Sequence, residues 1–164
     1  MEIWDLYDEN LELTGETMVR GDEVPEGRFH LVIHIWIINA KGEHLIQKRS
    51  QTVSTGAGKW ALTGGSAQKG ETSKQAIVRE VKEEIGIEIT EPEITSISRK
   101  LKGQFFLEIW LLKKDISIEA FTAGEEVEAV KFANEKEIRA MVEKDDFWDY
   151  HKVYLDQMFA VAMG

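Results

Sequence analysis

Three glutamates in one short segment are the residues most able to do chemistry. Glu80, Glu83 and Glu84 fall within a predicted helix. At about 100° per residue, Glu80 and Glu84 lie only about 40° apart around that helix, with Glu83 beside them. Carboxylates this close repel one another, and a hard divalent cation such as Mg²⁺ or Mn²⁺ would relieve the repulsion. By itself the spacing is also typical of a solvated acidic face.

The helix that carries these glutamates is predicted from its ends and its apolar stripe. Thr72 and Gln75 have the spacing of a capping box at a helix start. Gly86 suits the left-handed residue that ends many helices, and Gly65 lies in a glycine turn before the start. The apolar stripe recurs every four residues, as on a core-facing side, and consists of Ile77, Val81 and Ile85.

Residues 65–87 resemble the Nudix box, with every defining position filled. The matching positions are Gly65, Glu71 and the run Arg79-Glu-Val-Lys-Glu-Glu-Ile-Gly-Ile87. The resemblance extends from about Trp4 to about Ile138, so residues 1–164 are interpreted as a single Nudix hydrolase domain. It implies a metal-dependent pyrophosphohydrolase, an enzyme acting on acid anhydrides, that cleaves the diphosphate of a nucleoside diphosphate linked to another moiety X.

The resemblance also implies roles for the residues of the box. The implied ligands of Mg²⁺ or Mn²⁺ are the carboxylates of Glu80, Glu83 and Glu84 and the carbonyl of Gly65. Glu83 is further implied as an activator of water. Glu71 and Arg79 are implied to hold the loop against the helix as a structural ion pair.

A general base outside the box is expected on a loop near the late strands, as in several Nudix enzymes. Glu125, Glu126 and Glu128 occupy that region. Glu126 is the first choice because it directly precedes the apolar strand residue Val127. A solvated acidic loop is the alternative interpretation.

The segment from Arg28 to His34 also resembles isopentenyl diphosphate isomerase, a branch of the same superfamily. The resemblance places Gly64 and Ser66 at the positions of that enzyme's catalytic cysteine and of a nearby histidine that helps bind metal. It places Gln104 at the position of the partner glutamate and His30 at that of another metal histidine, although His30 is also typical of a hydrogen-bonded sheet histidine. Because the chain has no cysteine, isomerase chemistry is the alternative rather than the main hypothesis. A non-catalytic nucleotide sensor is a second alternative, which the complete set of box acids disfavours.

The substrate is predicted only as a class. Lys48, Arg49 and Lys59 are candidate phosphate contacts. ADP-ribose-like compounds, nucleoside triphosphates with damaged bases and dinucleoside polyphosphates remain open. Aromatic residues that could stack on a base, or pack in the core, are Trp36, Trp60, Phe105 and Phe106.

Composition limits the partners and the location. The formal charge of −10 argues against a general nucleic-acid binder. The acidic N-terminal residues and the lack of a long apolar run predict no signal peptide and no membrane association, so we expect a cytoplasmic enzyme. Without cysteine, no disulfide or thiol chemistry is available.

The order of strands and helices predicts an α+β fold, an α/β/α sandwich. The Nudix resemblance implies the same fold, with a central mixed sheet between the box helix and a C-terminal helix. The strongest strand is expected at 29–39, with residues 44–49 pairing back on it. Residues 14–27 are expected to form a loop. The C-terminal helix is expected to run over about 147–161, with a helical pattern of Trp148, Val153, Leu155 and Phe159 that forms a core or homodimer contact. The other expected elements are strands at 2–8, 11–13, 60–63 and 125–132, a hairpin of 94–101 with 104–112, and a helix capped by Asn134.

Overall fold

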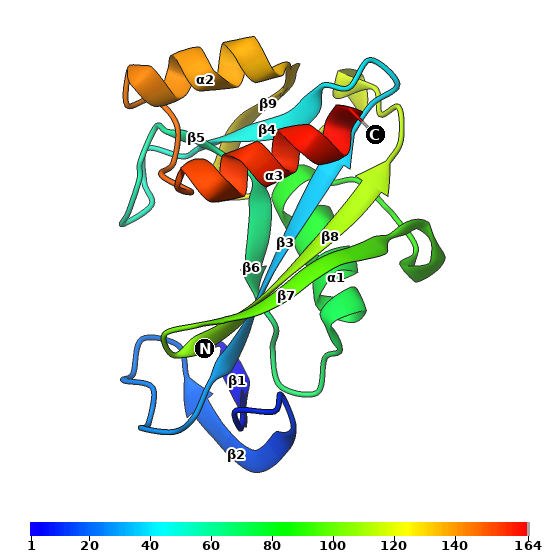
Figure 1. Cartoon of the computed structure of the whole chain (residues 1–164). Helices are drawn as coiled ribbons and strands as arrows, with labels where there is room; N and C mark the ends of the chain where they lie inside the picture. The colour runs from blue at the N-terminus through cyan, green and yellow to red at the C-terminus, as the bar shows by residue number, and fades with distance from the viewer. Residues whose placement is uncertain (164) are drawn as a thin grey trace.

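A seven-stranded mixed sheet forms the centre of the molecule (Figure 1). The computed structural model describes residues 1–163. In the middle, β3 (His30–Ile38) runs parallel to β8 (Phe105–Lys113) and antiparallel to β6 (Thr63–Ser66). β7 (Thr95–Lys102) pairs with β8 at one edge, and β4 (His44–Arg49) lies on the other side of β3. The remaining strands of this sheet, both paired with β4, are β5 (Trp60–Ala61) and β9 (Val127–Ala133).

Helices cover both faces of the sheet, which confirms the predicted α+β sandwich. α1 (Ser73–Ile85) lies on one face and α3 (Lys152–Met163) on the other, with α2 (Glu135–Glu143) nearby (Figure 1). Two short 3₁₀ turns, η1 (Glu91–Glu93) and η2 (Ile118–Ala120), complete the helical elements of residues 1–163.

Alternate side chains of β3 serve the two faces, because successive residues of a strand point to opposite sides. Leu31, Ile33, Ile35 and Ile37 pack with the stripe of α1, which is Ile77, Val81 and Ile85. Trp36 packs on the other face with residues of α3. Complete burial of one such aliphatic side chain contributes about 1.5–3 kcal/mol, so these contacts anchor α1 firmly on the sheet.

The predicted ends of α1 are confirmed. The Thr72 hydroxyl accepts a hydrogen bond from the Gln75 backbone N–H at 3.2 Å, and the Gln75 side chain accepts one from the Thr72 N–H at 3.0 Å. Gly86 ends the helix with a φ of 72°, and its N–H donates to the Lys82 carbonyl. Asn134 likewise caps α2.

The loop expected at 14–27 is partly wrong. β1 (Ile3–Tyr7) pairs antiparallel with β2 (Leu13–Val19), and the two strands form a separate sheet. No apolar pattern in the sequence indicates β2, because only one side chain of the strand, Met18, is buried and most of the others are polar. Backbone pairing with β1, rather than apolar burial of β2 itself, therefore defines this strand.

The pairing expected between residues 29–39 and 44–49 is wrong over most of its length. Only Ile38 and His44 are paired between β3 and β4. Beyond that point β5 pairs with β4 and β6 pairs with β3, while β9 pairs with β4 along its whole length, from His44 onward. The single strand expected at 60–63 is divided at Leu62, so that β5 joins β4 while β6 joins β3.

The C-terminal helix begins later than expected. α3 starts at Lys152, whereas Phe147 forms an isolated bridge with Trp60. Val153, which was expected on the packing side, is 74% exposed. Phe147 and Tyr150 pack on the core from an irregular segment before the helix, whereas Trp148 lines a cavity beside Arg49.

Candidate active site

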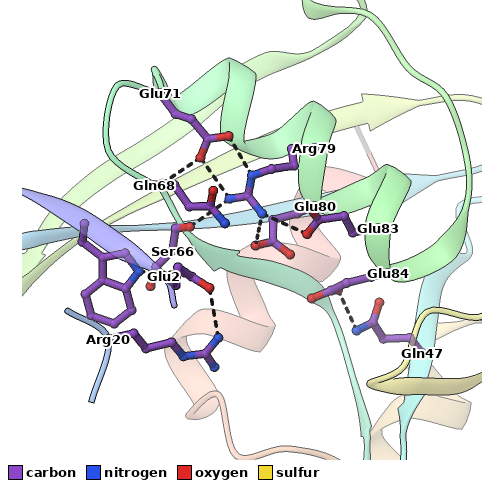
Figure 2. Close-up of polar contacts among 11 residues, drawn as sticks. Glu2, Arg20, Gln47, Ser66, Gln68, Glu71, Arg79, Glu80, Glu83 and Glu84 are labelled. Carbon is purple, nitrogen blue, oxygen red and sulfur yellow. Dashed lines mark hydrogen bonds and ion pairs between the residues drawn. The ribbon is translucent and has the colours of Figure 1, made fainter. Parts of the chain in front are cut away.

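Arg79 ties the glycine loop to helix α1 (Figure 2). Its Nε and Nη2 donate to the two carboxylate oxygens of Glu71 at 2.7 and 3.0 Å, and Nη2 also donates to the Ser66 carbonyl at 3.1 Å. Nη1 donates to Glu80 at 2.9 Å and to Glu83 at 3.0 Å. The expected ion pair of Glu71 and Arg79 is therefore present, in the strong bidentate geometry.

Arg79 keeps its positive charge in this setting. Burial lowers its pKa, but the hydrogen bonds and charges of Glu71 and Glu80 outweigh burial and hold the pKa above its ordinary value. The guanidinium thus supplies a fixed cation behind the acidic side chains of the helix.

Glu80 and Glu84 are the two half-buried carboxylates among the acidic residues of α1 that face the cavity. Glu84 accepts a hydrogen bond from Gln47 Nε2 at 2.9 Å (Figure 2). The Thr63 hydroxyl in turn donates to Gln47 Oε1 at 2.8 Å. This chain of bonds fixes the amide of Gln47 so that its donor faces Glu84. Glu83 is different, because 58% of its side chain is exposed.

Both buried carboxyl groups bind protons more tightly than usual. Burial raises the pKa of Glu80 to about 7, although the charge and hydrogen bond of Arg79 lower it. Burial and the charge of Glu80 raise the pKa of Glu84 well above its ordinary value, and Glu126 adds to the effect. Two mutually repelling buried carboxylates form a donor set that a divalent cation would stabilise.

Gly65 provides the space that Glu80 occupies. A Cβ atom at Gly65 would collide with Glu80 Oε1. Within residues 1–163, no three Asp, Glu, His or Cys side chains already have the arrangement of an assembled metal centre. Glu80 and Glu83 instead hydrogen bond Arg79, and Glu84 bonds Gln47. The hard oxygen atoms, their burial and the space beside Gly65 fit Mg²⁺ or Mn²⁺.

The acidic side chains of α1 open into a cavity of about 390 Å³, here named the carboxylate cavity. The loop residues 124–126 form a second wall, and Glu2 and Arg20 form a third. The α1 residues that line it are Glu80, Glu83 and Glu84. The structure therefore brings Glu126, the expected general base, into the same cavity as the expected metal ligands.

The loop that carries Glu126 is fixed to the end of α1. The Gly124 N–H donates to the Glu84 carbonyl at 3.2 Å, and the Glu126 carbonyl accepts from the Ser50 N–H at 2.9 Å. A Cβ atom at Gly124 would collide with the Glu83 carbonyl, so only glycine permits this close approach. Glu128, by contrast, pairs with Lys48 outside the cavity.

A second cavity, of about 400 Å³, is here named the aromatic cavity. Its walls include His34, Arg49, Phe105, Trp148 and Tyr150. A smaller hollow of about 230 Å³, the connecting hollow, shares residues 64–66 and Arg49 with the aromatic cavity. The hollow also shares its acidic lining residues with the carboxylate cavity; they are Glu2, Glu80, Glu84 and Glu126. The carboxylate cavity, the connecting hollow and the aromatic cavity thus form one continuous surface that runs past residues 64–66, at the start of the box.

Of the three basic residues expected to contact phosphate, the structure places only Arg49 in these cavities. The Arg49 guanidinium lies 5.1 Å from the Trp148 ring centroid, at the junction of the hollow and the aromatic cavity. Lys48 pairs with Glu128 at 3.2 Å and Lys59 with Asp145 at 2.9 Å. Neither lysine lines the three cavities.

The four aromatic candidates for base stacking occupy different environments. Trp36 is fully buried and donates to the Tyr154 hydroxyl at 2.8 Å, and Phe106 lies in the core beneath α1. Trp60 is covered by Lys131, whose Nζ lies 4.6 Å from the ring centroid. Only Phe105 lines the aromatic cavity.

The isomerase-like positions also have defined surroundings. His30 stacks on Trp4 with a centroid separation of 4.3 Å, and its Nδ1 lies 3.5 Å from the Ser66 hydroxyl. Burial lowers the pKa of His30. The Gln104 side chain donates to the Val24 carbonyl.

Several residues of the cavities were not singled out from the sequence. Glu2 and Arg20 lie in a segment without a motif, and Trp148 was assigned to a helix stripe. No local sequence pattern identifies them as cavity residues, because Glu2 and Arg20 lie near the N-terminus and Trp148 near the C-terminus, both far in sequence from the box. Only the folded arrangement brings them to the box.

None of the helices formed by residues 1–163 has the length and apolar character needed to cross a membrane.

Comparison with known proteins agrees with the geometry of the box. The NUDIX domain family model matches residues 28–157. An uncharacterized Nudix hydrolase of Listeria monocytogenes is 41% identical over 164 residues, which cover 97% of this chain and 94% of the relative. An isopentenyl-diphosphate Delta-isomerase of Escherichia coli is 37% identical over 67 residues, covering 40% of this chain and 37% of the isomerase.

Solved structures confirm the fold. The DR0079 protein of Deinococcus radiodurans has a TM-score of 0.72 at 21% identity, with 89% of this chain and 91% of that chain covered. A bifunctional NMN adenylyltransferase/ADP ribose pyrophosphatase of Francisella tularensis has a TM-score of 0.60 at 20% identity, with 88% and 42% covered. With the filled box, the family match and the Listeria relative in agreement, this chain belongs to the Nudix hydrolase family.

Proposed function

We propose that this protein is a metal-dependent pyrophosphohydrolase that cleaves the diphosphate linkage of a nucleoside diphosphate joined to another moiety X. The observation that carries the proposal is the convergence of Glu80, Glu84 and Glu126 on one cavity beside Gly65. The structural neighbour named as a bifunctional NMN adenylyltransferase/ADP ribose pyrophosphatase supports the class of reaction. In this reaction water attacks one phosphorus and the anhydride P–O bond breaks, leaving two phosphate products.

Glu80, Glu83, Glu84 and the Gly65 carbonyl would hold Mg²⁺ or Mn²⁺. When bound, the ion neutralises phosphate oxygens and promotes the ionisation of water. Arg79 orients Glu80 from behind through the 2.9 Å hydrogen bond, and Gln47 orients Glu84. Such fixed partners keep the carboxylates in a productive geometry.

Glu126 is proposed as the general base. It lies on a loop attached to the end of α1, and it lines both the carboxylate cavity and the connecting hollow. From there its carboxylate would accept a proton from the attacking water. Glu83, which is more exposed and bonded to Arg79, is proposed to contribute a further metal ligand or to help activate water.

The aromatic cavity is proposed to hold the nucleoside or the X group. Trp148 and Phe105 provide flat apolar surface, and Arg49 provides a cation where the cavity meets the connecting hollow. A planar group joined to an anionic linkage fits this combination of surfaces. ADP-ribose-like compounds, damaged nucleoside triphosphates and dinucleoside polyphosphates remain the candidate substrates. Lys48 and Lys59 could contact phosphate only after leaving their acidic partners.

The test is product release from a panel of these compounds with and without Mg²⁺. We expect turnover of at least one compound that requires the metal and falls at least about 100-fold in Glu84→Gln, because a misplaced or missing ligand disturbs the reacting geometry. Glu88→Gln is the matched control, since Glu88 pairs with Lys82 on the exposed side of the helix end. Full turnover by Glu84→Gln would contradict the assignment.

The same assay tests the general base. Glu126→Ala should lower kcat by about 100-fold, the usual range for a lost base, while the Mg²⁺ concentration for half-maximal activity stays unchanged. Glu128→Ala removes a neighbouring acid outside the cavity and should retain activity. Equal rates for the Glu126 and Glu128 variants would remove Glu126 from the mechanism.

Isomerisation of isopentenyl diphosphate is a second candidate function, favoured only by the partial isomerase similarity. Gly64 and Ser66 offer no thiol acid at the matching positions. Isomerisation by the purified protein would overturn the hydrolase mechanism. Tight binding of a panel compound without any cleavage would instead indicate a nucleotide sensor.

We further propose that the protein is cytoplasmic and forms a homodimer. Sedimentation analysis of the purified protein would test the homodimer.

A further inference from the structure

The N-terminal hairpin forms one wall of the candidate active site. β1 and β2 precede residues 28–157, which match the family model. Even so, Glu2 and Arg20, at the open end of the hairpin, line both the carboxylate cavity and the connecting hollow. Figure 2 shows their side chains facing one another in front of the box, beside Ser66 and Glu80.

The hairpin is bonded directly to the box loop. The Lys69 N–H donates to the Ile3 carbonyl at 2.8 Å, and the Gly70 N–H donates to the Asp5 carboxylate at 2.7 Å. These bonds join β1 to the loop that lies between Gly65 and the start of α1. Any group carried by the end of the hairpin therefore has a defined position relative to the box.

Apolar contacts hold the hairpin in the same place. The Trp4 ring stacks on His30 of β3 at 4.3 Å, with only 8° between the two planes. Leu6 and Met18 are buried with Trp4 in a small core of their own. Main-chain bonds between Tyr7 and Phe29 close the junction with β3. The hairpin is thus a packed part of the cavity wall.

Arg20 is held at the cavity by an exchangeable contact. Its backbone N–H donates to the Glu2 carbonyl at 3.0 Å, which fixes its main chain. Its guanidinium Nη1 lies 3.2 Å from Glu2 Oε2, with 59% of the Arg20 side chain exposed. An ion pair this exposed contributes little stability, so an anion entering the cavity can replace Glu2.

The charges of the cavity leave few other partners for a phosphate. Among the residues lining the carboxylate cavity, within residues 1–163, Arg20 is the one cation. Arg79 lies behind the carboxylates, where Glu71, Glu80 and Glu83 occupy its donors. In the connecting hollow a second guanidinium, that of Arg49, is present. Guanidinium groups suit phosphate because their planar donors bind two oxygens at once.

We propose that Arg20 is a substrate-binding residue contributed by the N-terminal hairpin. Its guanidinium leaves Glu2 and binds non-bridging oxygens of the substrate diphosphate, with Arg49 contacting the substrate on the side of the aromatic cavity. This inference rests on the proposed function of the carboxylate cavity. Arg20 is then a phosphate-recognition group outside residues 28–157, the part of the chain that the family model matches, and the hairpin takes part in substrate recognition.

Arg20→Ala tests the proposal by kinetics and by binding. Arg28→Ala is the matched control, because Arg28 belongs to the same segment, carries the same charge and pairs with Glu16 away from the cavities. For a compound that the wild type cleaves, we expect Arg20→Ala to raise KM about tenfold with a smaller change in kcat. Arg28→Ala should match the wild type.

The binding measurement separates this proposal from the proposed function. Calorimetry with α,β-methylene-ADP and Mg²⁺ should show about tenfold weaker binding for Arg20→Ala than for Arg28→Ala, whether or not the wild type cleaves any compound. If cleavage occurs but both variants bind and react alike, Arg20 has no role and the hydrolase assignment stands. Absence of cleavage contradicts the proposed function, and equal or undetectable binding overturns the Arg20 site as well.

Two further variants keep the proposal testable if Arg20→Ala does not fold. Arg20→Lys keeps the charge but loses the planar fork, so it should give intermediate binding and serves if Arg20→Ala does not fold. Glu2→Gln removes the competing carboxylate and should tighten α,β-methylene-ADP binding severalfold. Weaker binding in Glu2→Gln would contradict the exchange of Glu2 for phosphate.

Discussion

The adjacent residues Gly64 and Gly65 are both glycine because of different neighbouring atoms. A Cβ atom at Gly64 would lie 2.6 Å from the Ile33 carbonyl oxygen, which is fixed in the sheet. A Cβ atom at Gly65 would meet the end of the Glu80 side chain, which can move. The first glycine is therefore needed for folding and the second for the placement of a carboxylate.

Alanine substitutions should separate these two roles. Gly65→Ala should leave the thermal midpoint nearly unchanged but reduce Mg²⁺-dependent turnover at least about tenfold, because Glu80 is displaced. Gly64→Ala should lower the free energy of unfolding by about 1–3 kcal/mol, since the backbone must shift. Thermal melts together with turnover check both expectations. A Gly65→Ala protein with full activity would show that the position of Glu80 is unimportant.

At the scale of elements, α1 joins the core to the candidate site. Its stripe of Ile77, Val81 and Ile85 is fully buried, so the flank of the helix beside the stripe, with Glu80 and Glu84, has a fixed height and rotation. The capping box at Thr72 sets where the helix begins. The ends of the helix therefore contribute to the position of the acids several residues away.

Loss of the cap should be measurable as a loss of stability. Thr72→Ala removes the hydroxyl that accepts from the Gln75 N–H, so the free energy of unfolding should fall by about 1 kcal/mol. For a domain of this size that corresponds to roughly 2–4 °C in the thermal midpoint. Thr72→Ser retains the acceptor and should stay close to the wild type. Denaturant unfolding of the three proteins makes the comparison, and equal loss in both variants would assign the effect to something other than the hydroxyl.

At the scale of the whole molecule, buried histidines make stability depend on pH. Burial lowers the pKa of His34 and of His44 to about 4, with Lys102 adding to the effect at His34. His44, the first residue of β4, is fully buried with its ring against Phe159, and neither ring nitrogen makes a hydrogen bond of normal geometry, although the Met158 backbone partly offsets the lowering of the pKa. A protonated His44 is poorly accommodated there.

The sign of the effect follows from which state takes up protons first. Below about pH 6.5 the unfolded chain protonates His44, whereas the folded chain does so only near pH 4. The stability that neutral His44 provides is therefore complete above pH 6.5 and lost as the pH falls toward 4. Its share of the loss at pH 4.5 is about 2 kcal/mol.

His44→Leu should remove this contribution. Between pH 7 and pH 4.5 its free energy of unfolding should fall by about 2 kcal/mol less than that of the wild type. Glu80, whose raised pKa acts in the opposite sense, is present in both proteins and cancels in the comparison. Urea unfolding across this pH range is the measurement, and parallel pH curves would show that His44 is not responsible.

Much of the site was predictable because it is local in sequence. Residues of the glycine loop and of α1 alone are enough to predict several features. These are the start and end of α1, its buried stripe, the pairing of Glu71 with Arg79 and the grouping of Glu80 with Glu84. The α+β class also followed from the order of the predicted strands and helices, whereas the mixed sheet between two helices was implied by the resemblance to the Nudix family. Local hydrogen bonds and helical periodicity are enough to define such features.

The sequence alone thus determined the box, its helix and the class of reaction to be expected. The tertiary structure decided which distant residues join them. β4 shares only one pair with β3 but pairs along its whole length with β9, which brings the loop of Glu126 against α1. The weakly apolar β2 forms only because β1 pairs with it, and this places Arg20 at the cavity. Such long-range pairing depends on how whole strands share a sheet, which no single segment specifies.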